Sequence, residues 1–452
     1  QIRAGQNASS GSSTFKVKTS SLANLQGTSF NYRLPHQMAT LLSKGSPLSK
    51  DCQIRQGLAT TDNNRFVKYA WQVEPDKINH IWYPYAKGSG AEKWYSPVLH
   101  VVDWENDGMR IKNSVNEKYP YLKGKVAWVV KNESYYFKKG LCFSFVNTRS
   151  ITVRSLPPGC IFDVSASAIF PEQINADFLL GYLNSAIVVA LLRSMNPTIN
   201  YQVGDLKRLP LIGKNSELEN QVADSVRACL RARKQIESLS NPLILFSVVD
   251  REIEPFDLAQ DNNLTDKHKR YTDLLARLNQ SILDNEALID KNIFDLLKNH
   301  QGWDDTDTKE IAAWLSTYNQ DQRQDKQTPT PVYGRMYGRK SFLDNLILED
   351  LINTYLSIRP LQFLQGGKEI EINFELIDNH RARRQKIKFH LDKVDLAFIE
   401  ESAGLNVIDY LTLLLTSHMN KLFHQNPPFR IGKISLEKKK RYGGEPEPVR
   451  WK

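Results

Sequence analysis

The chain has 452 residues, and at about 100–200 residues per domain this length predicts two to four domains. Hydrophobic residues make up 41% and aromatic residues 10%, which excludes a wholly disordered chain. The net charge is +10: residues 1–214 contain 26 basic and 14 acidic residues, residues 215–378 contain 19 and 28, and residues 379–452 contain 15 and 8. Two basic ends flanking an acidic middle indicate either a polyanion-binding surface on part of the chain or ordinary solvated charge.

The chain contains four cysteines that stand singly in the sequence: Cys52, Cys142, Cys160 and Cys229. They show no zinc-ligand spacing, so we expect reduced thiols. No run of about 18 apolar residues is present, because the best candidate, 178–192, is interrupted by Asn184 and Ser185. Without a signal-peptide pattern after Gln1, we expect a cytoplasmic chain without a membrane span, either a fragment or a processed product.

In chain order, residues 1–14 are small and polar and predict a flexible tail. Residues 15–214 alternate short β-prone stretches (FKVK, KVAWVV, ITVR, CIFDV) with glycine, asparagine and proline, which predicts a loop-rich mixed α/β domain. Apolar residues at helical spacing predict one helix over 176–195, ended by Pro197.

Helical periodicity continues in residues 215–317, where we expect a helical spacer built from helices over 217–239 and 265–289. The preferred interpretation of this spacer is a helical hairpin with no ligand. A polar segment then predicts a linker over 318–332.

Residues 333–452 are predicted to form a small C-terminal α+β unit. Its expected elements are a strand over 370–377, a basic bend over 379–385, a strand over 386–391, a helix over 407–423 and a basic tail from Lys438. The predicted fold class of the whole chain is therefore α+β.

One catalytic-looking string is Asn426-Pro427-Pro428-Phe429, which matches the (D/N/S)-P-P-(Y/F) signature of amino-methyltransferases. That signature requires a buried strand before it, whereas the preceding residues predict a helix. No glycine-rich cofactor turn follows a strand elsewhere. We therefore interpret the string as a helix stop, and we predict no catalytic, cofactor-binding or metal-binding residues in this chain.

Residues 54–210 interleave amide, basic and aromatic side chains on loops, which is the chemistry that reading base edges requires. The alternative is that tryptophan and tyrosine fill a small core while asparagine and glycine form turns. Five strings in this region are more specific than composition: RQGLATTDNNRF at 55–66, YAKGSGAEKWY at 85–95, VDWENDG at 102–108, FLLGYLNS at 178–185 and NPTINYQVGDL at 196–206.

These strings, in this order, resemble the target-recognition region of the PglX family, the adenine-specific DNA methyltransferases of BREX phage-defence systems, which are related to type IIG restriction-modification enzymes. The leucine–asparagine–serine helix also resembles the specificity domain of Taq-type methyltransferases. The resemblance covers residues 15–214 and departs from the family at Thr61 and at 89–92. The family's N-terminal catalytic domain is not in this sequence, so the resemblance implies DNA target recognition, with S-adenosylmethionine bound elsewhere.

The implied partners are double-stranded DNA and a catalytic methyltransferase domain or other defence-system proteins. The candidate DNA-binding residues are Arg55, Gln56, Gly57, Thr60, Asn63, Arg65, Lys87, Gly88, Lys93, Trp94, Asn106, Gly108, Asn200, Gln202, Gly204, Arg381, Arg383, Arg384, Lys438, Lys439, Lys440 and Arg441. For the last seven a solvated basic face is an equal alternative. Two other functions stay open: a stand-alone specificity subunit for a separate methyltransferase or nuclease, and an amino-methyltransferase that uses Asn426–Phe429.

Overall fold

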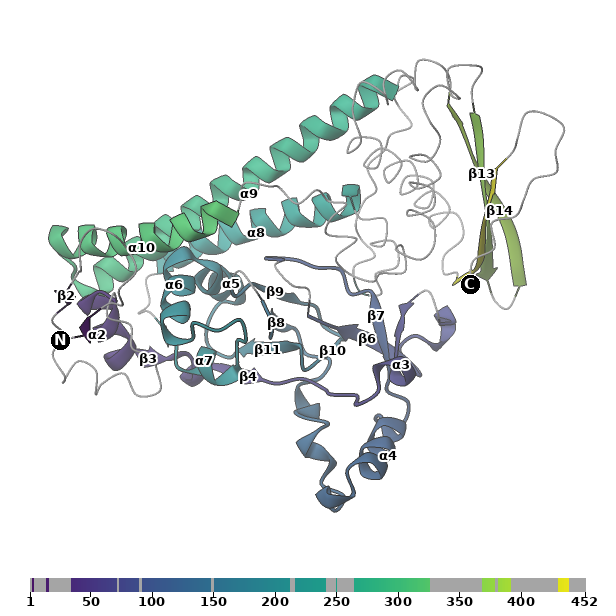
Figure 1. Ribbon diagram of the computed structural model, residues 1–452, viewed down its shortest axis with the longest axis horizontal. Helices are drawn as coiled ribbons and strands as arrows, with labels where there is room; N and C mark the ends of the chain where they lie inside the picture. The colour runs from purple at the N-terminus through teal and green to yellow at the C-terminus, as the bar shows by residue number, and fades with distance from the viewer. Residues whose placement is uncertain are drawn as a thin grey trace.

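The computed structural model describes residues 2–3, 14–15, 34–70, 73–88, 92–147, 150–211, 216–240, 249, 264–325, 368–378, 381–391 and 430–438. Helices and several small sheets make up these residues, which confirms the predicted α+β class. Two four-stranded sheets occupy the middle of the molecule, and the long helices α8 and α9 run along one side of it (Figure 1).

The first sheet is antiparallel and has the strand order β4-β11-β8-β9. Its strands are β4 (Cys52–Arg55), β11 (Ala166–Pro171), β8 (Gly140–Ser144) and β9 (Val153–Leu156). Every residue of β8 is buried, as expected for a central strand covered on both faces. The ITVR string, residues 151–154, contributes its last two residues to β9, as predicted.

The second sheet has the order β10-β6-β7-β5, with β10 parallel to β6 and the other pairs antiparallel. Its strands are β10 (Ile161–Phe162), β6 (Trp82–Ala86), β7 (His100–Asp103) and β5 (Val67–Tyr69). The short helix α3 (Asn63–Phe66) leads into β5, and the side chain of Asp62 caps it by accepting a hydrogen bond from the Arg65 backbone N–H at 3.1 Å. A 3₁₀ turn, η3, covers Pro75–Lys77.

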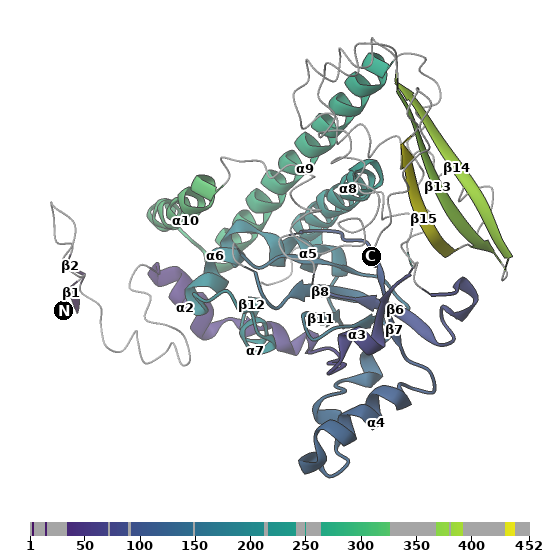
Figure 2. The ribbon, with the colours of Figure 1, turned by 45° about the vertical axis from the view of Figure 1, so that its right-hand side comes forward.

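A long insert between β7 and β8 carries α4 and three 3₁₀ turns, and Figures 1 and 2 both show α4 projecting below the sheets. The elements are α4 (Met109–Lys118), η4 (Pro120–Leu122), η5 (Val126–Trp128) and η6 (Glu133–Tyr135). The strand expected for KVAWVV is therefore wrong. Val126, Val129 and Val130 have the i, i+3, i+4 spacing of a helical turn, and all three pack on the same core.

The helix predicted over 176–195 is two helices, α5 (Ala176–Asn184) and α6 (Ala186–Met195), bent by 64°. Tertiary hydrogen bonds hold the break. The Asn184 side chain accepts from the Val153 N–H at 2.9 Å and donates to the Val153 carbonyl at 2.8 Å. Ser185 is extended there, and its hydroxyl donates to the Tyr182 carbonyl.

The two ends of the region 34–211 meet at a small sheet in which β3 (Ser46–Pro47) pairs with β12 (Pro210–Leu211). The Leu48 N–H donates to the Leu209 carbonyl at 2.7 Å beside it. The helices next to this junction are α2 (His36–Lys44), η1 (Leu48–Lys50) and α7 (Val203–Lys207). The pairing closes the region on itself and places α7 beside β4.

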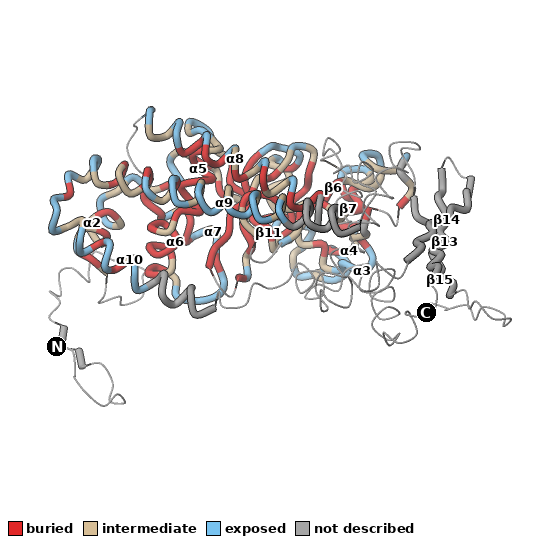
Figure 3. Tube along the Cα trace, turned by 90° about the horizontal axis from the view of Figure 1, so that it is seen from above, coloured by how far each residue is buried: buried red, intermediate tan, exposed pale blue. Residues whose placement is uncertain are grey.

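Helices α8 (Ser216–Ser240) and α9 (Leu264–Gln301) form the predicted hairpin, although α9 runs 12 residues past the predicted end at 289. Helix α5 packs closely on α8, since a Cβ on Gly181 would lie 2.6 Å from Val222. Buried residues of α5, α6, α8 and α9 share one core with the first sheet, and Figure 3 shows this buried centre.

Helix α10 (Asp305–Asp325) extends through the first part of the linker predicted over 318–332. Its beginning is fixed by the Asp304 carboxylate, which accepts from the Asp307 N–H at 2.8 Å. Ile311 and Trp314, one helical turn apart, are buried against the main core. Although its composition is mostly polar, this segment forms a helix because two apolar side chains anchor it to the core.

Near the C-terminus, β14 (Arg381–Leu391), β13 (Lys368–Asp378) and β15 (Arg430–Lys438) form an antiparallel sheet in the order β14-β13-β15. The bend expected over 379–385 is narrower than predicted, because Arg381 already pairs with Asp378 in the ladder. The strand predicted over 370–377 is confirmed. The expected helix over 407–423 and the string Asn426–Phe429 lie outside the described residues, as does most of the expected tail over 1–14, of which β1 (Ile2–Arg3) and the first residue of β2 (Thr14–Phe15) are described.

Within the described part of the chain, no single helix combines the length and apolar composition needed to cross a membrane. Helices α5 and α6 meet that test only as a bent pair. Their residues are mostly buried in the main core.

Candidate nucleic-acid interface

A polar pocket of about 280 Å³ lies where β4, α7 and the part of the insert that leads back to β8 come together. We call it the basic pocket. Its lining residues are Ile54, Arg55, Gln56, Lys131, Asn132, Phe145, Ser167, Gln202, Val203, Gly204 and Lys207. Three cations and three amides line it and no carboxylate does, so the lining favours an anionic ligand that carries hydrogen-bonding groups.

The pocket joins two predicted motifs that are about 150 residues apart in the sequence. Arg55 and Gln56 come from the first string, at the end of β4, and Gln202 and Gly204 come from the last, at the start of α7. Strand β3 precedes the first motif and β12 follows the last one. The pairing of β3 with β12 therefore brings the two motifs together.

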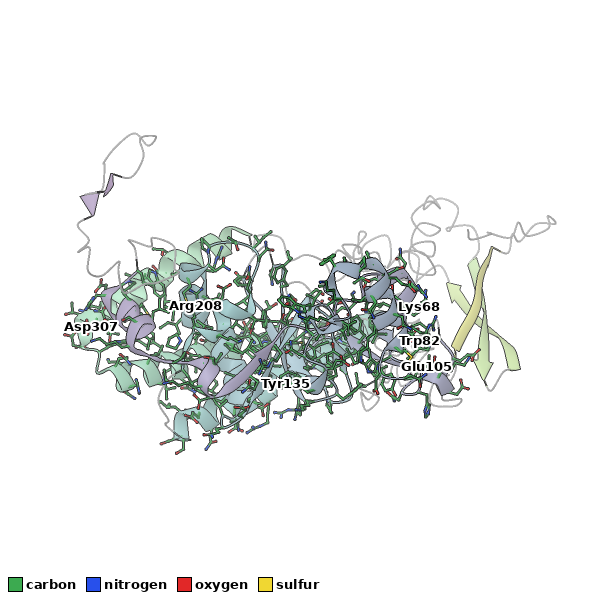
Figure 4. All side chains as sticks on the ribbon, turned by 90° about the horizontal axis from the view of Figure 1, so that it is seen from below. Lys68, Trp82, Glu105, Tyr135, Arg208 and Asp307 are labelled. Carbon is green, nitrogen blue, oxygen red and sulfur yellow. The ribbon has the colours of Figure 1, made fainter. Side chains whose placement is uncertain are left out.

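Arg55 lines the pocket, and its guanidinium is held by neighbouring side chains. Its Nη2 donates to Gln53 Oε1 at 2.5 Å and to the Tyr135 hydroxyl at 3.1 Å, and its guanidinium lies 4.8 Å from the centre of the Tyr135 ring. Lys138 approaches the same ring at 4.8 Å. In Figure 4, Tyr135 lies between Arg208 and Lys68 along the length of the molecule.

The opposite wall comes from the insert. Lys131 Nζ donates to Gln56 Oε1 at 2.7 Å, and Asn132 Nδ2 donates to the Gln56 carbonyl at 2.8 Å. Asn132 adopts a left-handed conformation with φ 58°, and asparagine tolerates this better than most residues. The insert is thereby fastened to the edge of the first sheet at Gln56.

The third wall is the beginning of α7. The Gln202 N–H donates to Asp205 Oδ2 at 3.0 Å, and Asp205 also accepts from Asn196 Nδ2 at 2.7 Å. Asp205 is paired with Arg208 at 3.0 Å, so its charge is neutralised locally. Gln202 and Gly204 are exposed, and a Cβ on Gly204 would meet nothing within 4 Å. This wall therefore has room for a ligand.

Gly57 has a structural reason to be glycine. It is buried, and an added Cβ would lie 2.1 Å from the Phe162 carbonyl and 2.5 Å from the Asp163 carbonyl. The chain crosses here from β4 to the second sheet, and Leu58 forms an isolated parallel bridge with Asp163. Close approach of its own backbone, rather than of a ligand, requires glycine at this position.

Three further candidates lie around α3, away from the pocket lining. Thr60 is buried and its hydroxyl donates to Asn63 Oδ1 at 2.6 Å, which orders the turn. Arg65 is exposed, with its guanidinium 4.9 Å from the centre of the Phe66 ring. Of these three, Arg65 is the one that places a positively charged side chain at an exposed position.

The string at 85–95 is largely engaged inside the protein. Lys87 pairs with the buried Asp163 at 3.3 Å, and the Gly88 N–H donates to Ser165 Oγ at 3.0 Å. Lys93 pairs with Glu286 of α9 at 3.4 Å, and the Trp94 indole N–H donates to the same carboxylate at 2.9 Å. Trp94 is only 2% exposed, so its ring packs in the main core and does not face a ligand.

Asn106 and Gly108 begin the insert in left-handed conformations with φ 49° and 71°. Gly108 is buried against Trp104, whose ring atoms would lie 2.5 Å from an added Cβ. Burial raises the pKa of Asp103 in the preceding strand, while Arg110, 2.7 Å away, opposes that rise. Asn200 is exposed, and its carbonyl accepts from Asn196 Nδ2 at 2.8 Å.

The C-terminal candidates lie in the separate three-stranded sheet or beyond the described residues. Arg381, Arg383 and Arg384 occupy the first half of β14, and Lys438 ends β15. Lys439, Lys440 and Arg441 lie outside the described part of the chain. Their proposed phosphate contacts stay predictions.

Sequence reasoning missed Lys131, Asn132 and Lys207, which complete the basic pocket. A usable signal existed, because residues 118–132 contain four lysines and no acidic residue. Among the described residues no group of three or more histidine, cysteine, aspartate or glutamate side chains is placed to hold a metal ion. All four cysteines are buried thiols.

The comparisons with known proteins confirm the resemblance that the motifs indicated. The chain is similar to the adenine-specific methyltransferase PglX of Lacticaseibacillus casei (strain Zhang), with 23% identity over 253 residues that cover 52% of this chain and 21% of that protein. It is also similar to the adenine-specific methyltransferase BrxX of Escherichia coli O9:H4 (strain HS), with 28% identity over 166 residues that cover 36% of this chain and 13% of that protein. No family model matches the chain.

One solved structure, the Type IIL restriction-modification enzyme MmeI in complex with DNA, aligns with 61% of this chain and 36% of that chain, at 15% identity and a TM-score of 0.39. The matched regions span about a fifth of PglX and about an eighth of BrxX. The chain is thus related to one portion of adenine-specific methyltransferases.

Proposed function

We propose that this chain is the sequence-specific DNA-recognition part of an adenine-N6 DNA methyltransferase in a phage-defence system of the BREX or restriction-modification type. The basic pocket carries the proposal, because it joins Arg55 and Gln56 to Gln202 and adds Lys131 and Lys207. Arginine can donate two hydrogen bonds to guanine and glutamine can pair with adenine, while lysines hold phosphates. The similarity to two adenine-specific methyltransferases supports this direction.

In this proposal the chain binds and orients duplex DNA, and the reaction belongs to a catalytic domain or partner that binds S-adenosylmethionine. Methylation of an adenine within a duplex requires that base to leave the stack. The recognition part contributes by fixing the register of the duplex through phosphate and base-edge contacts. These contacts position the duplex before the methyl group is transferred.

The test is duplex binding by the purified chain, first selected from a randomised pool and then measured by fluorescence anisotropy at several salt concentrations. We expect a preferred sequence and an affinity that falls steeply with salt, because lysine and arginine displace counterions from DNA. Absent or salt-insensitive duplex binding overturns the proposal. Binding of S-adenosylmethionine to the isolated chain, measured by calorimetry, would instead favour the amino-methyltransferase alternative.

Two variants separate base reading from phosphate binding. Gln202→Ala changes an exposed side chain and is expected to relax the preference at one base position, by about 1–3 kcal/mol of discrimination. Lys207→Ala is expected to weaken all duplexes alike and to reduce the salt slope by about one. Lys291→Ala on α9, where the lysine side chain is 71% exposed, is the matched control and should change neither.

A further inference from the structure

The insert between β7 and β8 contains a projecting finger, defined here as residues 109–131. Its inner side is anchored, because Ile111, Val115 and Val130 are buried in the second core cluster. Figures 1 and 2 show α4 and the turns after it extending away from both sheets. The finger is therefore a structured projection with its own apolar support.

The outer side of the finger carries two large aromatic residues in solvent. Tyr121 is 73% exposed and Trp128 is 69% exposed. Neither side chain belongs to the core cluster that the finger's valines and isoleucine join. Burial of these two rings therefore contributes little to the stability of the domain, and two large aromatic side chains exposed on one projection mark a candidate binding surface.

Lysines flank these two aromatic residues in the sequence. Lys118, Lys123 and Lys125 are exposed, and the segment 118–132 carries four lysines without an acidic residue. Lys123 and Gly124 both have positive φ, 49° and 80°, which turns the chain sharply between η4 and η5. A Cβ on Gly124 would meet nothing within 4 Å, so the backbone conformation rather than space selects glycine there.

The finger continues directly into the basic pocket. Lys131 ends the finger and lines the pocket, and its Nζ donates to Gln56 Oε1 at 2.7 Å. The next residue, Asn132, bonds the Gln56 carbonyl. The segment that carries the exposed lysines and aromatic residues is therefore continuous in the chain with the lining of the pocket.

From these observations we propose that the finger is a second DNA-binding element, in which Tyr121 and Trp128 stack on or wedge between bases while Lys123 and Lys125 bind the adjoining phosphates. The proposal rests on the proposed function, since it places the same DNA on the pocket and the finger. Base–aromatic stacking tolerates any sequence, because every base has a π-face. Inserted apolar side chains unstack a base step and kink the duplex. The finger thus distorts DNA, whereas the pocket reads it.

DNA suits this surface better than a protein partner does. Aromatic side chains alone would fit either, but the finger carries six basic residues against one carboxylate, Glu117, and this excess of positive charge complements a polyanion. The contact with the pocket adds continuity with a site whose lining also contains no carboxylate.

The experiment uses the preferred duplex of the full chain, with the fluorescent base 2-aminopurine placed at successive positions and a donor–acceptor dye pair at the two ends. We expect wild-type binding to raise 2-aminopurine emission at one or two neighbouring positions and to shorten the end-to-end distance. Trp128→Ala should weaken binding about tenfold and remove both signals. Lys123→Ala with Lys125→Ala should reduce the salt slope by about two while preserving the position of any residual signal.

Leu283→Ala on α9 is the matched control, because that leucine is 53% exposed and lies far from the finger in sequence. It should behave as wild type, and circular dichroism should show all variants folded. If the wild-type chain binds no duplex, both proposals are overturned. If the wild-type chain binds a duplex but Trp128→Ala and Tyr121→Ala leave the affinity and both signals unchanged, only the DNA-binding role of the finger is overturned. In that case the two exposed aromatic residues would instead serve as a surface for a protein partner.

Discussion

The carboxylate of Asp290 accepts a hydrogen bond from the backbone N–H of Ala186 at 2.7 Å, so a side chain from α9 caps the beginning of α6. A carboxylate at a helix N-terminus satisfies an otherwise unbonded N–H and interacts favourably with the helix dipole. The bend between α5 and α6 is therefore held from outside the bent segment, by a helix about 100 residues later in the chain.

Asp290→Ala is expected to lower the free energy of unfolding by about 1–3 kcal/mol, because it leaves the Ala186 N–H without its acceptor. Asp290→Asn keeps an acceptor oxygen and should cost less. Urea denaturation followed by circular dichroism measures both. Equal losses in the two variants would show that charge, and not the hydrogen bond, supports the break.

The same residue predicts a pH dependence. Burial raises the pKa of Asp290 above its ordinary value, so the folded chain holds this proton more tightly than the unfolded chain does. The contribution of Asp290 to stability therefore decreases as pH rises from about 4 through its folded pKa, and it is constant above both values. Asp290→Asn should remove this component of the pH dependence above about pH 4. An unchanged pH profile in the variant would contradict the prediction.

Asn184→Ala is expected to destabilise the fold by about 2–4 kcal/mol, since the N–H and the carbonyl of Val153 both lose their partner in a buried place. Asn279→Ala is a suitable control. That asparagine lies on α9 and donates from its side chain to the Leu275 carbonyl on an exposed surface, so its loss should stay within about 0.5 kcal/mol. Comparable effects of the two substitutions would mean that the Val153 contacts are not important.

These contacts show where sequence reasoning stopped. Periodicity correctly predicted helical structure over 176–195, but the break at Ser185 depends on Val153 and Asp290, which are distant in sequence. The KVAWVV string has high β-propensity, yet its valines also fit a helical turn, and the core they meet decided between the two. A local hydrophobic pattern decides between a strand and a helix only where a single periodicity fits the residues.

The candidate site divides in the same way. The motifs contain Arg55, Gln56 and Gln202, which the structure brings into one pocket through the β3–β12 closure. The same motifs also contain Trp94, whose aromatic character suited a base-stacking role equally well. Composition does not distinguish a ring that faces a ligand from one that fills a core. Burial distinguishes them, and burial depends on the whole fold.

Two glycines of the predicted site should respond in opposite ways. Gly57→Ala places a Cβ against two backbone carbonyls and is expected to cost about 3 kcal/mol of stability. Gly204→Ala has open space and lies in α7, so its stability should stay within about 1 kcal/mol of wild type. Thermal denaturation of both variants checks this pair, and a stable Gly57→Ala protein would contradict the packing described here.

Gly204 also allows a test of the pocket's electrostatics. Gly204→Glu adds a negative charge to a lining that has none, whereas Gly204→Gln adds a similar volume without charge. If the pocket binds phosphate, duplex affinity should fall further for the glutamate variant, and the difference should shrink as salt increases. Equal affinities at low salt would place the DNA elsewhere.

The cysteines should be unreactive in the folded chain. Burial raises the pKa of Cys52 and of Cys229 to about 12, so neither forms appreciable thiolate at pH 8. Ellman's reagent is expected to titrate almost no thiol in native protein at pH 8 and all four after denaturation. Rapid labelling of one thiol under native conditions would reveal local opening at that cysteine.

Helix α9 has 38 residues and, at 1.5 Å per residue, a length of about 57 Å. Each residue added to such a helix advances its end by about 1.5 Å and turns it by about 100°. Because α8 packs along α9, an added length that rotates the apolar stripe away from α8 exposes that stripe to water. Changes close to a whole number of turns, such as about seven or eleven residues, nearly restore the phase. The length of the hairpin can therefore change without exposing the stripe only in discrete steps.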